Sequence, residues 1–165
     1  MRSDHERPDA QLHRRAPPRE VYEAVLDVRA WWSGRIEGTT DVQGGEFTYE
    51  VPDIHWTKFR VTELVPGERV AWLTLDSWLS FPEDHQEWTG TTIRFDIRPT
   101  DGGTELVFTH EGLTPAAECY TVCHTAWGDY VTGSLRDLVL TGAGTPNAFE
   151  GPEVLALARE GRSAR

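Results

Sequence analysis

Residues 118–140, with the sequence ECYTVCHTAWGDYVTGSLRDLVL, decide the fold because their large side chains recur at helical spacing. Steps of three and four residues place these side chains on one stripe, which consists of Tyr120, Cys123, Trp127, Val131, Leu135 and Leu138. The spacing predicts the longest helix of the protein. We expect Thr114 to cap this helix and Pro115 to lie in its first turn, where a missing backbone N–H is tolerated. Gly142 and Gly144 then supply its end.

Two short helices are predicted near the N-terminus. Residues 9–15 alternate weakly and are interpreted as a short first strand. Residues 19–28 follow two prolines and carry valine and alanine at helical spacing, and a second short helix is predicted over residues 27–32. Trp31 and Trp32 are too bulky for both to stay exposed, so at least one of them should pack inward.

The middle of the chain has the period of two that is typical of β-strands. Turn sequences such as Pro-Gly and Asp-Gly separate the alternating segments. The predicted strands cover residues 46–51, 55–65, 69–76, 88–98 and 104–110. Residues 77–87 break the alternation and are predicted to form a long loop that carries Trp78 and His85.

This order of elements predicts an α+β fold. An antiparallel sheet must cover its apolar face, and the C-terminal helix is the only predicted element large enough to do so. We therefore expect a curved antiparallel sheet wrapped round this helix, with room for a small molecule between the two. A single domain should span residues 9–144. The tails would be residues 1–8 and 145–165, and the second tail contains a short predicted helix at 152–159.

Charge and composition argue against several classes of protein. The 165 residues carry 16 Lys and Arg against 27 Asp and Glu, a net charge of −11, so nucleic acids and anionic membranes would be repelled. No apolar run approaches the ~20 residues that cross a bilayer, and the N-terminus lacks the apolar core of a signal peptide. We expect a cytoplasmic protein. Its seven tryptophans are of a type that often lines ligand cavities.

The two cysteines, Cys119 and Cys123, lie four residues apart on the predicted helix. This separation does not favour disulfide geometry, and we interpret them as reduced thiols packed like small apolar side chains. With His124 beside them they could suggest a metal site, whose further ligands would have to be His110 or Glu111. The spacing matches no usual zinc motif. We therefore predict no metal and no cofactor.

His110 is the strongest catalytic candidate, although we assign no catalytic residue. It ends a strand on the same face as Leu106 and Phe108, so we expect it near the mouth of a cavity. A histidine there can act as an acid or a base near neutral pH. A histidine that only bonds backbone at a strand end explains the same pattern, and we favour that interpretation. The sequence contains no nucleophile motif, phosphate-binding loop or dinucleotide fingerprint.

Several short motifs resemble those of one superfamily. They are Pro18, Val21, Tyr22 and Ala24 in the first helix, Trp31-Trp32, the pattern Gly44-Gly45-X-Phe47, residues 63–70 (ELVPGERV), 102–106 (GGTEL) and 109–113 (THEGL), and His124 with Trp127 in the last helix. Together they resemble the helix-grip (SRPBCC) superfamily, which contains START, Bet v 1-like and polyketide cyclase domains. Within it, the chain is most similar to bacterial proteins of the activator of heat-shock-chaperone ATPase homologue type. The resemblance covers residues 12–140.

The resemblance and the aromatic content imply a domain that binds an apolar or aromatic small molecule between the sheet and the C-terminal helix. The expected cavity walls are Trp56, Phe59, Trp72, Trp78, Trp88, Phe95, Phe108, His110, Tyr120, Cys123 and Trp127. Among these, the polar tips of His110 and Tyr120 would fix the orientation of the ligand.

Two other functions stay open at this point. The resemblance also implies a polyketide cyclase or aromatase-like enzyme, in which His110 would move protons. It further implies a stress-response module that acts on a chaperone. Self-association as a homodimer, through a sheet edge or through the loop that carries Trp78, is left open as well.

Overall fold

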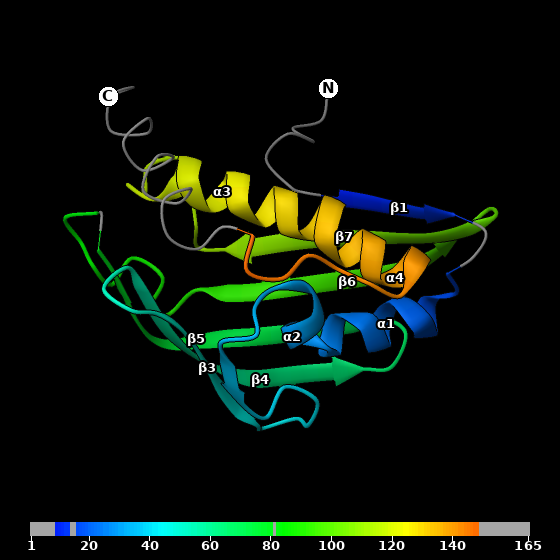
Figure 1. Cartoon of the computed structure of the whole chain (residues 1–165), viewed down its shortest axis with the longest axis horizontal. Helices are drawn as coiled ribbons and strands as arrows, with labels where there is room; N and C mark the ends of the chain where they lie inside the picture. Colours follow the sequence, from blue (N-terminus) through cyan, green and yellow to red (C-terminus); the bar gives the residue numbers. More distant parts are fainter. Residues whose placement is uncertain (1–8, 14–15, 81, 149–165) are drawn as a thin grey trace.

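The computed structural model describes residues 9–13, 16–80 and 82–148. Within them, seven antiparallel strands form one curved sheet in the order β1-β7-β6-β5-β4-β3-β2 (Figure 1). The strands are β1 (Asp9–His13), β2 (Ile36–Gly38), β3 (Glu46–Val51), β4 (His55–Val65), β5 (Arg69–Leu79), β6 (Thr92–Thr100) and β7 (Gly103–Glu111). The helices are α1 (Pro18–Leu26), α2 (Val28–Trp31), α3 (Tyr120–Asp129), the π-helix η2 (Tyr130–Leu135) and α4 (Arg136–Thr141).

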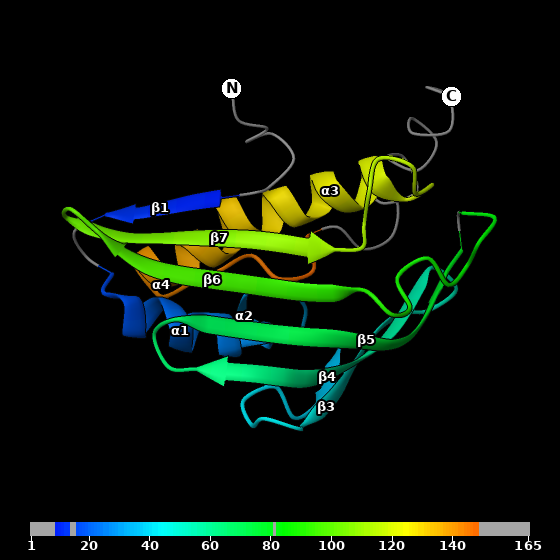
Figure 2. The same cartoon turned by 180° about the vertical axis from the view of Figure 1, so that it is seen from behind.

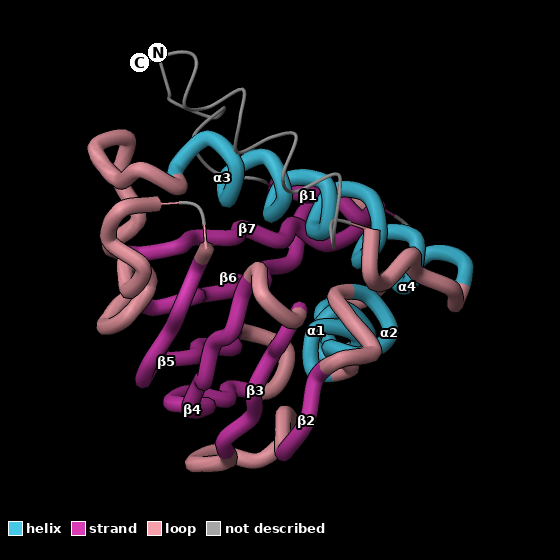
Figure 3. The backbone as a smooth tube through the Cα atoms, turned by 60° about the vertical axis from the view of Figure 1, so that its left-hand side comes forward, coloured by secondary structure: helices cyan, strands magenta, loops and turns pink. Residues whose placement is uncertain are grey.

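The described helices lie on one face of the sheet. Figure 1 shows α3 and α4 running across this face, with α1 and α2 beside α4. Figure 2 shows the opposite face, over which the described chain places no helix. In Figure 3 the sheet curves beneath α3, and α1 and α2 close one end. The predicted α+β class, with a curved sheet round a long C-terminal helix, is confirmed. No helix in the described ranges is long and apolar enough to span a membrane.

Alternation along the strands separates a buried face from a charged face. The large apolar side chains of the inner face are Phe47, Tyr49, Phe59, Val61, Val70, Trp72, Ile93, Phe95, Ile97, Leu106 and Phe108, and all of them are buried. On the outer face, Arg69 donates to Asp96 at 2.7 Å, and Arg94 pairs with both Asp96 and Glu111. Ion pairs this exposed add little stability, so burial of the inner face is what holds the sheet against the helices.

The long helix starts later than predicted. Thr114 and Pro115 lie in turns before α3, so the prediction that they cap and open the helix is wrong. The carboxylate of Glu87 accepts hydrogen bonds from the backbone N–H of Glu118 at 2.6 Å and of Cys119 at 2.9 Å. Amides at a helix start have no partner within the helix. Here the carboxylate of Glu87, on a distant loop, is the partner of these amides. Local sequence patterns do not reveal a partner that lies so far away along the chain.

A π-helix interrupts the predicted single helix. In η2 the extra residue in the turn changes the phase of the buried stripe, so Tyr130 and Val131 are both buried, as are Ser134 and Leu135. Gly142 ends α4 in a left-handed conformation with a φ of 85°. This end is the predicted one, because glycine adopts that conformation without a steric penalty.

Two predicted strand boundaries are wrong. β5 continues to Leu79, so Trp78 lies in a strand and not in the following loop. β6 begins at Thr92, so Trp88 lies in the loop before it. Gly90, with a φ of 87°, turns the chain just before β6. β1 confirms the predicted first strand, and the helix predicted at residues 152–159 falls outside the described part of the chain.

Ser134 in η2 and the segment after α4 together fix the Trp31-Trp32 pair. The hydroxyl of Ser134 donates to the carbonyl of Trp31 at 2.7 Å, and the backbone N–H of Asn147 donates to the carbonyl of Trp32 at 2.8 Å. The side chain of Asn147 also donates to Ser33. Both tryptophans are buried, which confirms that at least one of them packs inward. Figure 1 shows this segment in orange.

Arg29 covers the outer edge of the sheet at β2, the last strand in the order. Its Nε donates to the carbonyl of Ile36 and its Nη2 to the carbonyl of Gly38, both at 3.0 Å. Carbonyls of an edge strand have no partner strand on their outer side, and the guanidinium takes that place.

We expect Gly144→Ala to lower the free energy of unfolding by about 1–3 kcal/mol. The added methyl group would lie 2.5 Å from the carbonyl oxygen of Ala30 and 3.0 Å from that of Ser134, so backbone would have to shift. Urea denaturation measures the change. Gly133→Ala is the control, because its methyl group would meet no atom within 4 Å and alanine favours a helix by up to ~1 kcal/mol. Equal losses in both variants would contradict this packing.

Candidate ligand-binding site

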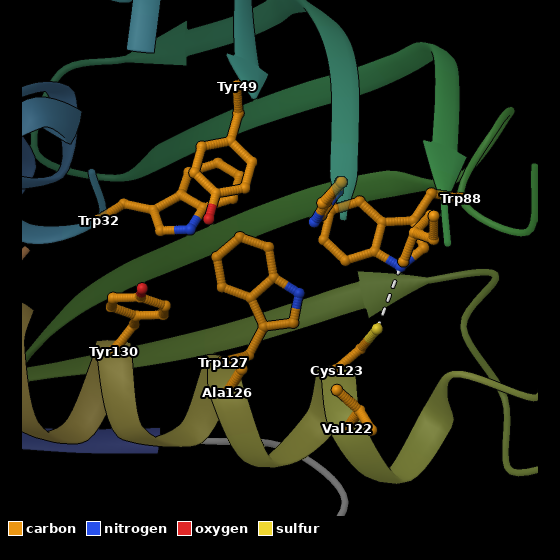
Figure 4. Close-up of a pocket in the computed structure, with 10 residues that line it drawn as sticks. Trp32, Tyr49, Trp88, Val122, Cys123, Ala126, Trp127 and Tyr130 are labelled. Carbon is orange, nitrogen blue, oxygen red and sulfur yellow. Dashed lines mark hydrogen bonds between the residues drawn. The ribbon is translucent and has the colours of Figure 1, made fainter. Parts of the chain in front are cut away.

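A cavity with a volume of about 50 Å³ lies between the sheet and α3. Its walls come from β3, β4, β5, the end of α2, the loop before β6, the helix α3 and the start of η2. The ten lining residues are Trp32, Tyr49, His55, Leu79, Trp88, Val122, Cys123, Ala126, Trp127 and Tyr130 (Figure 4). None of them is Asp, Glu, Lys or Arg. The site is therefore an apolar pocket with a few polar atoms in its wall.

Five aromatic side chains surround the cavity in consecutive contact. Trp32 stacks on Tyr49 with the ring centres 4.4 Å apart. The ring of His55 is perpendicular to Tyr49 at 5.0 Å and to Trp88 at 4.6 Å. Trp127 closes the circuit, 5.9 Å from Trp88 and 4.9 Å from Trp32. Such pairs contribute about 0.5–1.5 kcal/mol each beyond their burial, so the wall is rigid where these rings meet.

We infer that the cavity opens at Ala126 and His55. These two side chains are half-buried, whereas the other lining residues are buried. A small side chain at Ala126, one turn before Tyr130 on the helix, leaves the opening free. A larger side chain at this position would fill it.

Trp88 is the wall residue that lies on a loop, just before β6. Its Nε1 donates to the sulfur of Cys123 at 3.3 Å (Figure 4). Its carbonyl accepts from the hydroxyl of Thr91 at 2.6 Å, and the neighbouring Glu87 is bonded to the start of α3. The carbonyl of Trp88 also accepts from the backbone N–H of Thr91 at 3.0 Å. Backbone hydrogen bonds between Thr74 and the residues Gly90 and Thr91 tie the following turn to β5. Trp88 itself lies outside the ladder of β5 and β6, which begins at Thr92, so a change in the position of its side chain would leave that ladder unbroken.

His110 lies against Trp88 and does not line the cavity. The two rings are perpendicular, with their centres 4.9 Å apart. Nε2 of His110 lies 2.8 Å from the hydroxyl oxygen of Thr91. Because the hydroxyl hydrogen of Thr91 goes to the carbonyl of Trp88, Nε2 must be the donor. Nδ1 is then a bare acceptor, and it has no partner among the residues that the structure describes.

Desolvation keeps both inner histidines neutral. It lowers the pKa of His110 to about 3, with a smaller contribution from His55. It also lowers the pKa of His55 to about 3, and Nε2 of His55 lies 2.5 Å from the hydroxyl of Thr57. Sequence reasoning missed His55, although alternation in β4 places it on the same face as Thr57 and Phe59.

The predicted wall residues fall into three groups. Those that line the cavity are Trp88, Cys123 and Trp127. Those that are buried around it in the core are Phe59, Trp72, Phe95, Phe108 and His110. Those that lie away from it are Trp56, Trp78 and Tyr120. Tyr120 is half-buried and stacks on His124 at 5.2 Å.

Trp56 and Trp78 face each other across β4 and β5 on the outer side of the sheet, and Trp78 is 39% exposed. Between Lys58 and Phe59 the pairing shifts by one residue. Such a bulge reverses which side chains point inward beyond it. As a result, Leu79 reaches the cavity, and Trp78 stacks on His85 outside it.

The two cysteines are free and buried. A hydrogen bond with Cys123, together with burial, raises the pKa of the Cys119 thiol well above its usual value. A thiol of this kind is a poor nucleophile and a poor metal ligand. Within the described ranges, no three His, Cys, Asp or Glu side chains are grouped so that they could hold a metal ion.

The fold and the cavity define a domain of the helix-grip class. A family model described as Activator of Hsp90 ATPase homolog 1-like protein matches residues 15–139. The chain belongs to this family. A comparison with curated proteins gives no significant match.

Three solved structures illustrate the similarity. The Aha1 dimer from Colwellia psychrerythraea is 26% identical, with 84% of this chain and 98% of that chain covered and a TM-score of 0.64. DynU16, a putative protein in the dynemicin biosynthetic locus, is 18% identical, with coverage of 84% and 49% and a TM-score of 0.58. CalU16 from Micromonospora echinospora is 16% identical, with coverage of 96% and 82% and a TM-score of 0.56. At these identities the last two show the fold alone.

We expect stability to fall as the pH drops below about 6.5. Both histidines have folded pKa values of about 3, so between about pH 6.5 and 3 the unfolded chain takes up protons that the folded chain does not. The buried His110 should cost about 2 kcal/mol between pH 7 and pH 5, and the half-buried His55 less, because water screens it in part. Urea denaturation at the two pH values measures the slope. His110→Phe should reduce it, and an unchanged slope would contradict a neutral, buried His110.

Proposed function

We propose that the protein binds a small apolar or aromatic molecule in the cavity between the sheet and α3. The observation that carries the proposal is the circuit of five aromatic rings round a space whose lining includes no charged side chain. Ligand pockets in proteins are mostly apolar, with a few polar groups that fix orientation. This wall has that composition, and its mouth lies at the small side chain of Ala126.

Binding of a ring-sized molecule requires Trp88 to move. A volume of about 50 Å³ is a third of the ~150 Å³ of an engineered cavity that binds benzene. Among the wall residues, we expect Trp88 to be displaced, because it lies on a loop. Its hydrogen bonds there go to Thr91 and Cys123, and the neighbouring Glu87 bonds the start of α3. The proposal therefore includes outward displacement of Trp88 when the ligand enters.

We propose binding and not catalysis. The candidate base of a cyclase-like enzyme is His110, and Trp88 lies between it and the free space of the cavity. His110 is also neutral, with a pKa of about 3, so it could only be a weak base near neutral pH. Interaction with a chaperone, which the name of the family describes, has no observation of this site in its favour.

Native mass spectrometry tests the proposal. After incubation with cell extract, the wild-type protein should carry a reproducible extra mass that denaturation removes. Ala126→Leu should lose this mass, because the larger side chain fills the mouth. Thr121→Leu is the matched control: it adds the same side chain to an exposed position of the same helix and should retain the ligand. A clean mass for the wild type, or equal retention in both variants, would count against binding in this cavity.

A further inference from the structure

We infer that the ligand carries a neutral oxygen acceptor, such as a ketone or aldehyde carbonyl, and that the indole N–H of Trp127 recognises it. This inference rests on the proposed function, because it names the chemical class of the molecule that would occupy the same cavity. It also assigns a specificity-determining role to one wall residue.

The indole nitrogen of Trp127 is a buried donor without an acceptor. The side chain is 3% exposed, it lines the cavity, and its Nε1 has no hydrogen-bond partner within the described part of the chain. Figure 4 shows this nitrogen turned toward the Trp88 and Cys123 side of the pocket. Buried polar groups are almost always hydrogen-bonded in folded proteins. An acceptor on the ligand would supply the missing bond.

Two neighbouring polar groups of the wall are already engaged. The indole N–H of Trp88 donates to Cys123, and Nε2 of His55 is bonded to Thr57. Among the lining residues, Trp127 is the one whose buried N–H has no acceptor within the described part of the chain, so it is the donor offered to an acceptor that enters the cavity. This leaves one defined direction for the polar end of the ligand, while its apolar body lies against the rings.

Charge limits the kind of acceptor. An ammonium group carries no acceptor, so it would leave the indole N–H of Trp127 without a partner, and the lining has no carboxylate to balance its buried charge. An anion would meet a lining without Lys or Arg, in a protein of net charge −11, and its burial without a partner would be costly. A carbonyl oxygen on an apolar body satisfies the donor and adds no charge.

The structure also offers a matched control. Nε1 of Trp72 is likewise buried without a partner among the described residues, but Trp72 does not line the cavity. Trp127→Phe and Trp72→Phe thus remove the same chemical group, once inside the cavity and once outside it.

The test compares two ligands of the same shape. Acetophenone carries a C=O group where α-methylstyrene carries C=CH2, and isothermal titration calorimetry measures the affinity of both. The wild type should prefer acetophenone by roughly fivefold, the effect of one neutral hydrogen bond. Trp127→Phe should reduce the preference below about twofold, and Trp72→Phe should keep it. If Trp127→Phe does not fold, NMR of the wild type replaces it, and acetophenone should shift the Trp127 indole N–H resonance more than α-methylstyrene does.

The outcomes separate this inference from the proposed function. Equal affinity of the wild type for both probes, a preference that survives Trp127→Phe, or equal NMR shifts would overturn the role of Trp127 and leave binding in the cavity intact. Binding of neither probe by the wild type, together with a clean native mass, would overturn both.

Discussion

The ring of Trp32 holds the layers of this protein together. It contacts Tyr49, Phe59 and Trp72 on the sheet, with ring centres 4.4–6.2 Å apart, and it contacts Trp127 on α3 at 4.9 Å. Each contact adds a fraction of a kcal/mol or more beyond the burial of the rings. Because one side chain reaches both the sheet and the helix, its position fixes the distance between them. The hydrogen bond from Asn147 to its backbone secures that position.

Aromatic packing of this kind leaves little free volume. In a protein interior, side chains fill the space to the density of an organic crystal, and here indole rings do so up to the edge of the cavity. The remaining space lies where the wall passes from strands to a loop, at Trp88. Trp88 is the member of the circuit that lies just before a strand and not within one, so its side chain can change position without breaking the backbone bonds of a strand.

Regular alternation allowed β3 and β4 to be predicted with their observed bounds, because each side chain chooses one of two faces. The same rule would have placed His55 on the inner face. It would have placed Trp56 on the outer face, together with Lys58 and Arg60. The prediction placed Trp56 in the cavity wall because of its aromatic character. The bulge that turns Trp78 outward depends on pairing between strands, which no local pattern records. The position of Trp32 could not be predicted either, because it is set by a segment more than a hundred residues away along the chain.

The guanidinium of Arg29 gives the sheet a defined end. An edge strand with free carbonyls can act as a template on which a partly unfolded chain adds a further strand. Arg29 occupies the carbonyls of Ile36 and Gly38, so β2 presents a cation where a growing sheet would need acceptors. A single side chain therefore protects one of the two edges of the sheet, the edge at β2, from pairing with a further strand.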